Sequence, residues 1–359
     1  MPDIKLDFKN TYILSAINEE RMPEHLWFRD RYFPTGEGDI FTADKVLTEY
    51  RVGSRKMAAF VAPRIGSLPV ERQGYEVHEY EPAQIGVSRS LSADDLTKRG
   101  FGEAIYSQDT PAKRAKRLLM EDLDELDARI SRREEWMCVQ TMLNNACDMQ
   151  EYTDNGVQGE LKHIQFYGVS SDHTYTIGSN KEWNKQNGNF FGDVAAMAKK
   201  LKKRGLPATE LLLGADAAAA IGDIQKVRDL LDKNSGIRVG EKLELVEKYP
   251  GITYMGTLNF GGAHLDMYCI DETYEADDGT DTAYFPTKGA LVTAPGCGHL
   301  MYGQITQIPF GSSEFETFAK KRVPKFDVEG NTRKLELAAR PLAAPKKYCP
   351  WIYAADVID

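Results

Sequence analysis

The stretch DTPAKRAKRLLMEDLDELDARISRREEWMCVQTMLNNACDM, residues 109–149, contains no glycine and no proline after its third residue. Its opening Asp109-Thr110-Pro111 is typical of a helix start, because a polar side chain caps free backbone amides and proline fits the first turn. Leucine and isoleucine recur from Leu119 to Ile130 at spacings of three and four. We predict one spine helix over 109–149, with an uninterrupted part of about 55 Å at 1.5 Å per residue. Such a helix is too long for the interior of one compact domain.

The charges of this helix fall in blocks. Near its start, where the helix dipole disfavours cations, lie four basic residues: Lys113, Arg114, Lys116 and Arg117. Acidic residues follow over 121–127, and the spacing predicts i,i+4 pairs between Arg117 and Glu121 and between Glu125 and Arg129. Two interpretations stay open, a solvated face and a surface that contacts an acidic neighbour. The apolar repeat is too short to predict a coiled coil.

The segments before the helix lack a core of their own. Residues 1–45 read as an arm of short apolar clusters, and residues 46–92 as a long β-ribbon whose returning half, 84–91, alternates like a half-buried strand. A ribbon of two strands is too small to be stable alone. It is either a solvated hairpin or, as we favour, an element that lies across a neighbouring molecule. We expect contacts between subunits from the following residues of the ribbon and the helix: Arg55, Lys56, Phe60, Arg64, Arg72, Arg114 and Arg117.

The remainder of the chain alternates helices and strands before it becomes mainly strands. Residues 150–190 are rich in turns, with one strand at 161–169. Asp193 is predicted to cap a helix that ends before Gly205, and Leu211 to Leu213 is typical of a buried strand. A second helix, with its apolar residues over 224–231, is predicted to stop at 234–236. The tail from 334 to 357 predicts two strands around a turn at Ala344-Pro345.

The length, composition and charge of the chain exclude several classes of function. The 359 residues correspond to about two domains, and 42% hydrophobic residues suffice for a sizeable core. The 45 basic and 54 acidic residues give a net charge of −9, which argues against nucleic-acid binding as the main role. The first ten residues resemble neither a signal peptide nor an anchor, and the most apolar window, 211–221, is far shorter than the ~20 residues that span a bilayer. We therefore expect a soluble protein made in a cytosol, without membrane contact.

Candidate chemistry is sparse. There are five cysteines and no Cys-x-x-Cys, so reduced thiols are expected: Cys138, Cys147, Cys269, Cys297 and Cys349. Cys297 and His299 could form a nucleophile and base, and with His264 and Cys269 they could bind zinc, but the spacing fits neither well. The acidic run 277–281 resembles a calcium loop less than it resembles a hairpin turn between Tyr274 and Tyr284. The turn at 213–216 has no glycine fingerprint for phosphate. We predict no catalytic residue, no metal and no cofactor.

The order of these parts, an arm, a ribbon, a spine helix, an α/β segment and returning strands, resembles the major capsid proteins of tailed phages with the Hong Kong 97-type fold. The resemblance is strongest to the lambda head protein E family. It rests on strings spread through the chain: FRDRYFP (28–34), AAFVAP (58–63), DTP (109–111), EWNK (182–185), YFP (284–286), ALV (290–292) and RPL (340–342) with Asp356-Val357.

This resemblance implies an α+β fold with five parts. They are an N-terminal arm (1–45), an E-loop (46–92), a P-domain (93–190) with the spine helix, an A-domain (191–310) and C-terminal P-domain strands (311–359). It also implies hexamers and pentamers in an icosahedral shell around a double-stranded DNA genome, in the virion and, during assembly, in the host cytoplasm.

The resemblance implies partners as well. These are other copies of the chain, a portal protein, a scaffold or protease during assembly, a decoration protein, and packaged DNA that is contacted weakly at the inner face. Some relatives crosslink a ribbon lysine to an asparagine. Lys56 lies in the corresponding region, but no partner residue is identifiable, and we expect no crosslink here. Two alternatives remain, an encapsulin-like bacterial nanocompartment shell protein and a soluble α/β enzyme.

Overall fold

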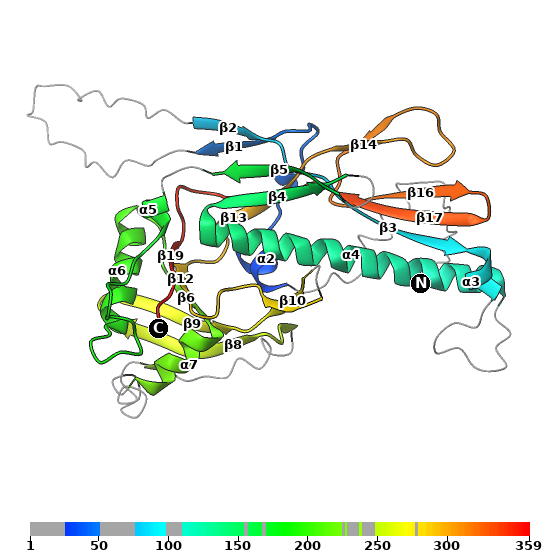
Figure 1. The fold of residues 1–359 in the computed structure, drawn as a ribbon. Helices are drawn as coiled ribbons and strands as arrows, with labels where there is room; N and C mark the ends of the chain where they lie inside the picture. The colour runs from blue at the N-terminus through cyan, green and yellow to red at the C-terminus, as the bar shows by residue number, and fades with distance from the viewer. Residues whose placement is uncertain are drawn as a thin grey trace, which may run out of the picture.

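A long helix, α4 (Pro111–Asn144), runs through the middle of the molecule and links its two main sheets (Figure 1). Its start is as predicted, because Thr110 Oγ1 accepts a hydrogen bond from the Lys113 amide at 3.3 Å. The structure is a computed structural model that describes residues 26–50, 76–97, 110–153, 157–166, 170–224, 227, 237–238, 248–276 and 279–359.

The helix ends five residues earlier than predicted. Asn145 is buried and adopts a left-handed backbone with φ of 51°, which Asn tolerates better than most residues. The Asn145 carbonyl accepts hydrogen bonds from the Phe166 amide (3.1 Å) and the Gln165 side chain (3.0 Å). The chain therefore turns at Asn145 and continues as a strand. The sequence offered no glycine or proline to mark this end.

The N-terminal half of α4 packs against a three-stranded antiparallel sheet of order β16-β17-β3. Leucine and isoleucine side chains of the helix, predicted from their spacing, form a core cluster with Phe326, Leu335 and Leu337 of the sheet. The strands are β3 (Ile85–Ser92), β16 (Val323–Glu329) and β17 (Thr332–Ala339). Burial alternates along β3, which confirms the half-buried strand. β3 pairs with β17, however, so it does not belong to the ribbon's hairpin.

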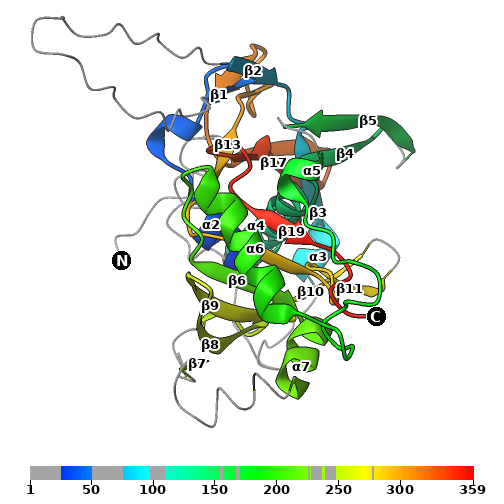
Figure 2. The ribbon, with the colours of Figure 1, turned by 90° about the vertical axis from the view of Figure 1, so that its left-hand side faces the viewer.

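The six-stranded sheet lies near the other end of α4 and has order β19-β12-β6-β9-β8-β7. Its strands are β6 (Glu210–Gly214), β7 (Ile237–Arg238), β8 (Ile252–Phe260), β9 (Ala263–Ile270), β12 (Ala290–Thr293) and β19 (Ile352–Ala354). Leu211 and Leu213 of β6 pack in one core cluster with α6 (Phe190–Lys203) and α7 (Ala215–Asp223), and Leu212 packs in a second with the arm and α4. Figure 2 looks onto α6 on the first of these faces. Burial on both faces confirms the predicted buried strand.

Four hairpins surround these sheets. They are β1 (Val46–Tyr50) with β2 (Glu76–Tyr80), β4 (Ala146–Tyr152) with β5 (Gln158–Gln165), β10 (Thr273–Glu275) with β11 (Asp281–Ala283), and β14 (Ile305–Gln307) with β15 (Glu316–Phe318). The β10–β11 pair confirms the predicted hairpin. Figure 1 shows β1 and β2 at the upper edge of the molecule.

Short elements complete the fold: α2 (Trp27–Tyr32), η1 (Glu37–Asp39), α3 (Ala93–Thr97) and α5 (Ser170–His173). β13 (Gly298–Tyr302) pairs with β18 (Pro341–Pro345), which packs on α4. In the part of the chain described, no helix combines the length and the apolar character that crossing a bilayer requires.

Three local predictions were wrong. Ala344 and Pro345 lie within β18 and not in a turn, because β18 continues its pairing with β13 through both residues. The tail has three strands and not two, since β17, β18 and β19 follow one another there, and β19 pairs with β12 in the six-stranded sheet. The cap of α6 is Asn189, whose side chain accepts a hydrogen bond from the Gly192 amide, so Asp193 lies inside the helix. Most of the predicted second helix, 224–231, lies outside the described residues.

Candidate assembly surfaces

The arm helix α2 is held by a carboxylate from a distant part of the chain. Its own N-cap residue, Leu26, has no capping side chain. Instead, Glu135 of α4 accepts hydrogen bonds from the amides of Phe28 (2.7 Å, Oε1) and Arg29 (2.8 Å, Oε2). Glu135 is fully buried. We call Glu135 and the α2 residues it contacts the arm seat.

The opposite side of α2 is tied to the six-stranded sheet. Arg31 forms an ion pair with Glu210 at the start of β6, and the Tyr32 hydroxyl donates to Glu210 at 2.6 Å. The guanidinium of Arg31 lies over the rings of Trp27 (4.7 Å to the centroid) and Tyr268 (5.2 Å). Cation–π contacts of this kind stabilise partly buried arginines. α2 therefore joins the spine helix to the sheet.

A second buried group fixes the C-terminal strands to α4. Arg322 donates two hydrogen bonds to Glu134, at 2.6 and 3.0 Å, and a third to Asp127 at 2.5 Å. The Tyr302 hydroxyl donates to Glu134 at 3.0 Å. Burial acts to raise the pKa of Glu134, but the charge and hydrogen bonds of Arg322, the charge of Arg29 and the hydrogen bond from Tyr302 together lower it. Losing one partner of such a buried pair costs about 3–5 kcal/mol.

Large apolar side chains are exposed mainly on the hairpins. Leu47 and Val77 lie on the same face of the β1–β2 hairpin and are 47% and 49% exposed. Phe315, beside β15, is 75% exposed. Others on hairpins or hairpin loops are Tyr152, Val157, Leu161, Phe260 and Val328. One exposed leucine is ordinary, but apolar side chains gathered on projecting elements are typical of a protein interaction surface.

Five of the seven predicted contact residues lie outside the described residues: Arg55, Lys56, Phe60, Arg64 and Arg72. The other two are on α4. Arg114 donates to the Leu96 carbonyl at 3.2 Å, and Arg117 Nε lies 3.8 Å from Glu121 Oε1. The i,i+4 pair of Glu125 with Arg129, at 3.0 Å, also forms as predicted. Arg114 thus has a contact within its own chain, which the sequence did not reveal.

The proposed nucleophile and base do not pair. Cys297 accepts a hydrogen bond from Thr293 Oγ1 at 3.4 Å, and burial raises the pKa of its thiol to about 12. His299 Nδ1 instead lies 3.0 Å from Asp39 Oδ1, and burial lowers the pKa of the imidazole. A thiol with so high a pKa is a poor nucleophile at neutral pH. The structure does not support a Cys–His couple.

The metal candidates are not brought together either. In the described part of the chain, no three His, Cys, Asp or Glu side chains are grouped as metal ligands. All five cysteines are free. Asp277 and Asp278 of the acidic run lie outside the described residues.

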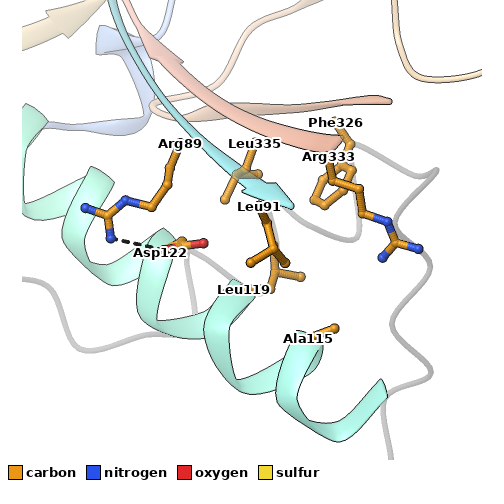
Figure 3. A pocket seen from close by; sticks show the side chains of 8 residues that line it. All are labelled: Arg89, Leu91, Ala115, Leu119, Asp122, Phe326, Arg333 and Leu335. Atoms are coloured by element: carbon orange, nitrogen blue, oxygen red, sulfur yellow. Dashed lines mark hydrogen bonds and ion pairs between the residues drawn. The ribbon is translucent and has the colours of Figure 1, made fainter. Parts of the chain in front are cut away.

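A shallow hollow lies between the N-terminal half of α4 and the three-stranded sheet (Figure 3). It has room for about one water molecule. Arg89 and Asp122 form an ion pair at 3.0 Å at its edge. The remaining lining is mainly apolar: Leu91, Ala115, Leu119, Phe326, Leu335 and the stem of Arg333. A hollow of this size holds no substrate.

Exposed apolar side chains on several hairpins indicate a subunit that associates with other chains. Two solved structures share its fold. A putative capsid protein of a prophage of Escherichia coli CFT073 gives a TM-score of 0.67 over 98% of this chain and 99% of that one, at 14% identity. A phage-related protein of Bordetella bronchiseptica gives 0.51 over 96% and 97%, at 11% identity.

Sequences of known phage proteins are also similar to this chain. The major capsid protein of Enterobacteria phage P21 is 24% identical over 254 residues, which cover 70% of each chain. The major capsid protein of Escherichia phage lambda is 23% identical over 178 residues, 48% of each. The family model of phage major capsid protein E matches residues 10–354, and the chain belongs to this family. The Hong Kong 97-type fold class predicted from the sequence is confirmed, and the chain is a structural capsid subunit of a tailed phage and not an enzyme.

Proposed function

We propose that copies of this chain form hexamers and pentamers that tile an icosahedral shell around a double-stranded DNA genome. The observation that carries this proposal is the outer face of the β1–β2 hairpin, on which Leu47 and Val77 are exposed, whereas the opposite face, with Val46 and Thr48, is buried on the body. Covering exposed apolar side chains of this kind gains stability. A neighbouring subunit would supply the covering surface, and many such weak contacts add up across a shell.

The division of labour follows the predicted parts. The arm (1–45) and the E-loop (46–92) would contact neighbours, and the P-domain with α4 would form the periphery of each capsomer. The A-domain (191–310) would lie around the capsomer centre. Pairing of β3 with β17 and of β19 with β12 supports a modified division, in which β3 belongs to the P-domain and β19 to the A-domain.

The same proposal includes partners. A portal protein, a scaffold or protease and a decoration protein would act with the shell, which would assemble in the host cytoplasm. The net charge of −9 supports weak contact with packaged DNA at the inner face, because an acidic wall does not arrest a polyanion.

Deletion of residues 55–73 tests the role of the ribbon. We expect soluble capsomers or monomers but no closed shells, visible by negative-stain electron microscopy and by size-exclusion chromatography. The matched control replaces the same segment by a glycine-serine linker of equal length, which keeps the hairpin base and its connection. Closed shells of normal size from both variants would contradict the proposed role.

The contents of purified particles distinguish a phage head from a bacterial nanocompartment. Purified particles that contain DNA and a portal protein by mass spectrometry support a virion shell. Particles that instead enclose a cargo enzyme would contradict this proposal.

A further inference from the structure

One arginine side chain contacts both ends of the β1–β2 hairpin. Arg340 lies between β17 and β18, and its side chain is 14% exposed. Its Nη1 lies 3.2 Å from Asp44 Oδ1, just before β1. Its Nε donates a hydrogen bond to the Pro82 carbonyl at 2.9 Å, and its Nη2 donates one to Glu81 Oε1 at 3.4 Å, both just after β2. We call these four residues the hairpin clamp.

The arginine of the clamp belongs to the body of the subunit. Its neighbours in the chain, Ala339 and Pro341, are both buried and lie in β17 and β18, which pair with β3 and β13. The Gly303 amide donates a hydrogen bond to the Arg340 carbonyl at 2.9 Å. A Cβ at Gly303 would lie 3.2 Å from Arg340 Cδ, so the glycine leaves room for the arginine stem. Paired strands on both sides therefore fix the position of Arg340.

The carboxylates of the clamp flank the hairpin and are more exposed than the arginine. Asp44 is 62% and Glu81 is 52% exposed. Asp44 Oδ1 also accepts a hydrogen bond from the Gln304 side chain at 3.2 Å, and Glu81 Oε1 lies 3.8 Å from Lys162 Nζ. Each of these two contacts holds one end of the hairpin, whereas Arg340 holds both. A planar guanidinium has five donors at fixed angles, which lets it serve several acceptors at once.

We propose that Arg340 is the positioning residue of the β1–β2 hairpin, because it holds both ends on the β17–β18 junction and so sets the direction in which the exposed Leu47 and Val77 are presented. This direction is a property of the single subunit. Its importance for a shell rests on the proposed function, since a neighbouring subunit would receive the hairpin at one angle.

Burial of the inner face of the hairpin acts differently from the clamp. Val46 and Thr48 are buried on the body. Burial favours contact without fixing an angle, since the hydrophobic effect is non-directional. Charge-assisted hydrogen bonds from a planar group do fix an angle. Burial therefore keeps the hairpin near the body, and the clamp sets its direction. Without Arg340 the two ends lose their common anchor, and the hairpin pivots at Asp44 and Pro82.

Distances between two spin labels in the full-length chain test the clamp. One label is attached at Val77→Cys on the hairpin and the other at Ser90→Cys on β3, both exposed positions. Labelled chains are diluted into unlabelled chains, so that the distances within one chain are measured. We expect one narrow distribution with Arg340 present. In Arg340→Gln, a displaced population should increase by about tenfold or more, because charge-assisted hydrogen bonds are lost. An unchanged distribution would overturn the proposal.

Two controls separate positioning from general loosening. Labels at Ser90→Cys and Lys199→Cys, the latter on α6, report on the body, and Arg340→Gln should leave their distance unchanged. Lys45→Gln removes the same charge from an exposed pair with Glu79, at 3.4 Å, within the hairpin. Its distribution between positions 77 and 90 should equal that of the chain with Lys45. Broadening of the body distance, or a displaced population in Lys45→Gln as large as that in Arg340→Gln, would overturn the proposal.

A double variant tests whether the carboxylates act through the arginine. Asp44→Asn keeps an oxygen that accepts from Gln304 but loses its charge. It should enlarge the displaced population when Arg340 is present and add nothing in Arg340→Gln, because residues that share one contact are not additive. Additive effects would overturn the proposal. If Arg340→Gln does not fold, Asp44→Asn with Glu81→Gln removes both negative charges of the clamp, and an unchanged distribution there overturns it. None of these measurements depends on shells, so the clamp and the proposed function fail independently.

Discussion

The two halves of α4 use charge in opposite ways. In the N-terminal half, Arg89 contacts Asp122 and Glu125 at 3.0 and 2.6 Å, and its side chain is about one third exposed. In the C-terminal half, Arg322 and Glu134 form a buried pair. Exposed pairs contribute about 0.2–1 kcal/mol, whereas breaking a buried one costs several kcal/mol. Most residues of the charge blocks visible in the sequence therefore stabilise the helix less than Glu134 does, except for Asp127, which also bonds to Arg322.

Replacing Arg322 tests the buried half and should have the largest effect. Arg322→Met removes the hydrogen-bonded cation of buried Glu134 and leaves Arg29, at 3.5 Å, beside it. We expect a loss of about 3–5 kcal/mol in the free energy of unfolding. Denaturant titration followed by tryptophan fluorescence measures it. The double variant with Glu134→Gln should recover part of the loss. A loss of unfolding free energy below 1 kcal/mol would show that the buried pair stabilises the helix no more than the exposed pairs do.

A cavity in the N-terminal half should have the next largest effect. Leu123 is fully buried against the three-stranded sheet. We expect Leu123→Ala to cost about 2–5 kcal/mol in the same titration. Ala128, on the same helix but outside this cluster, gives the matched control when replaced by Ser. If Leu123→Ala and Ala128→Ser lower the unfolding free energy by the same small amount, the N-terminal half of α4 is loosely packed against the sheet.

Charge reversal at the start of α4 should separate assembly from folding. In Arg114→Glu with Arg117→Glu, the loss of the Leu96 contact is opposed by the preference of the helix dipole for anions, about 0.3–1 kcal/mol per residue. We expect unfolding to change by less than about 1 kcal/mol while the yield of shells falls. Lys113→Glu with Lys116→Glu is the control of equal charge. Parallel losses of stability and assembly would assign these arginines to the helix alone.

The exposed pair should have the smallest effect. Arg129 is paired with Glu125 at i,i+4 and is 59% exposed. Arg129→Ala should cost about 0.3–0.5 kcal/mol, and less at 1 M salt because of screening. A loss above 2 kcal/mol would show that surface charge contributes as much as the buried pair.

The sequence predicted features that depend on local spacing. The start of α4 at Thr110, the buried strand at Leu211 to Leu213 and the β10–β11 hairpin are of this kind. It could not predict the turn at Asn145, which depends on hydrogen bonds from residues about 20 positions away.

The arm seat was missed for the same reason. Glu135 and Phe28 are 107 residues apart. One signal was present in the sequence. Glu134 and Glu135 interrupt the apolar side of the helix between Ile130 and Met137, a side that packs against the rest of the chain and does not face solvent. Charged residues on an otherwise buried face indicate partners elsewhere in the chain.

β19, at the edge of the six-stranded sheet, is synthesised well after its neighbour β12. About 60 residues separate β12 from β19, which at 5–20 residues per second is about 3–12 s of translation. During that interval the backbone of β12 lacks the neighbour that later covers it. Until β19 is made, the edge of β12 is unpaired, and such an edge can pair with a strand of another chain.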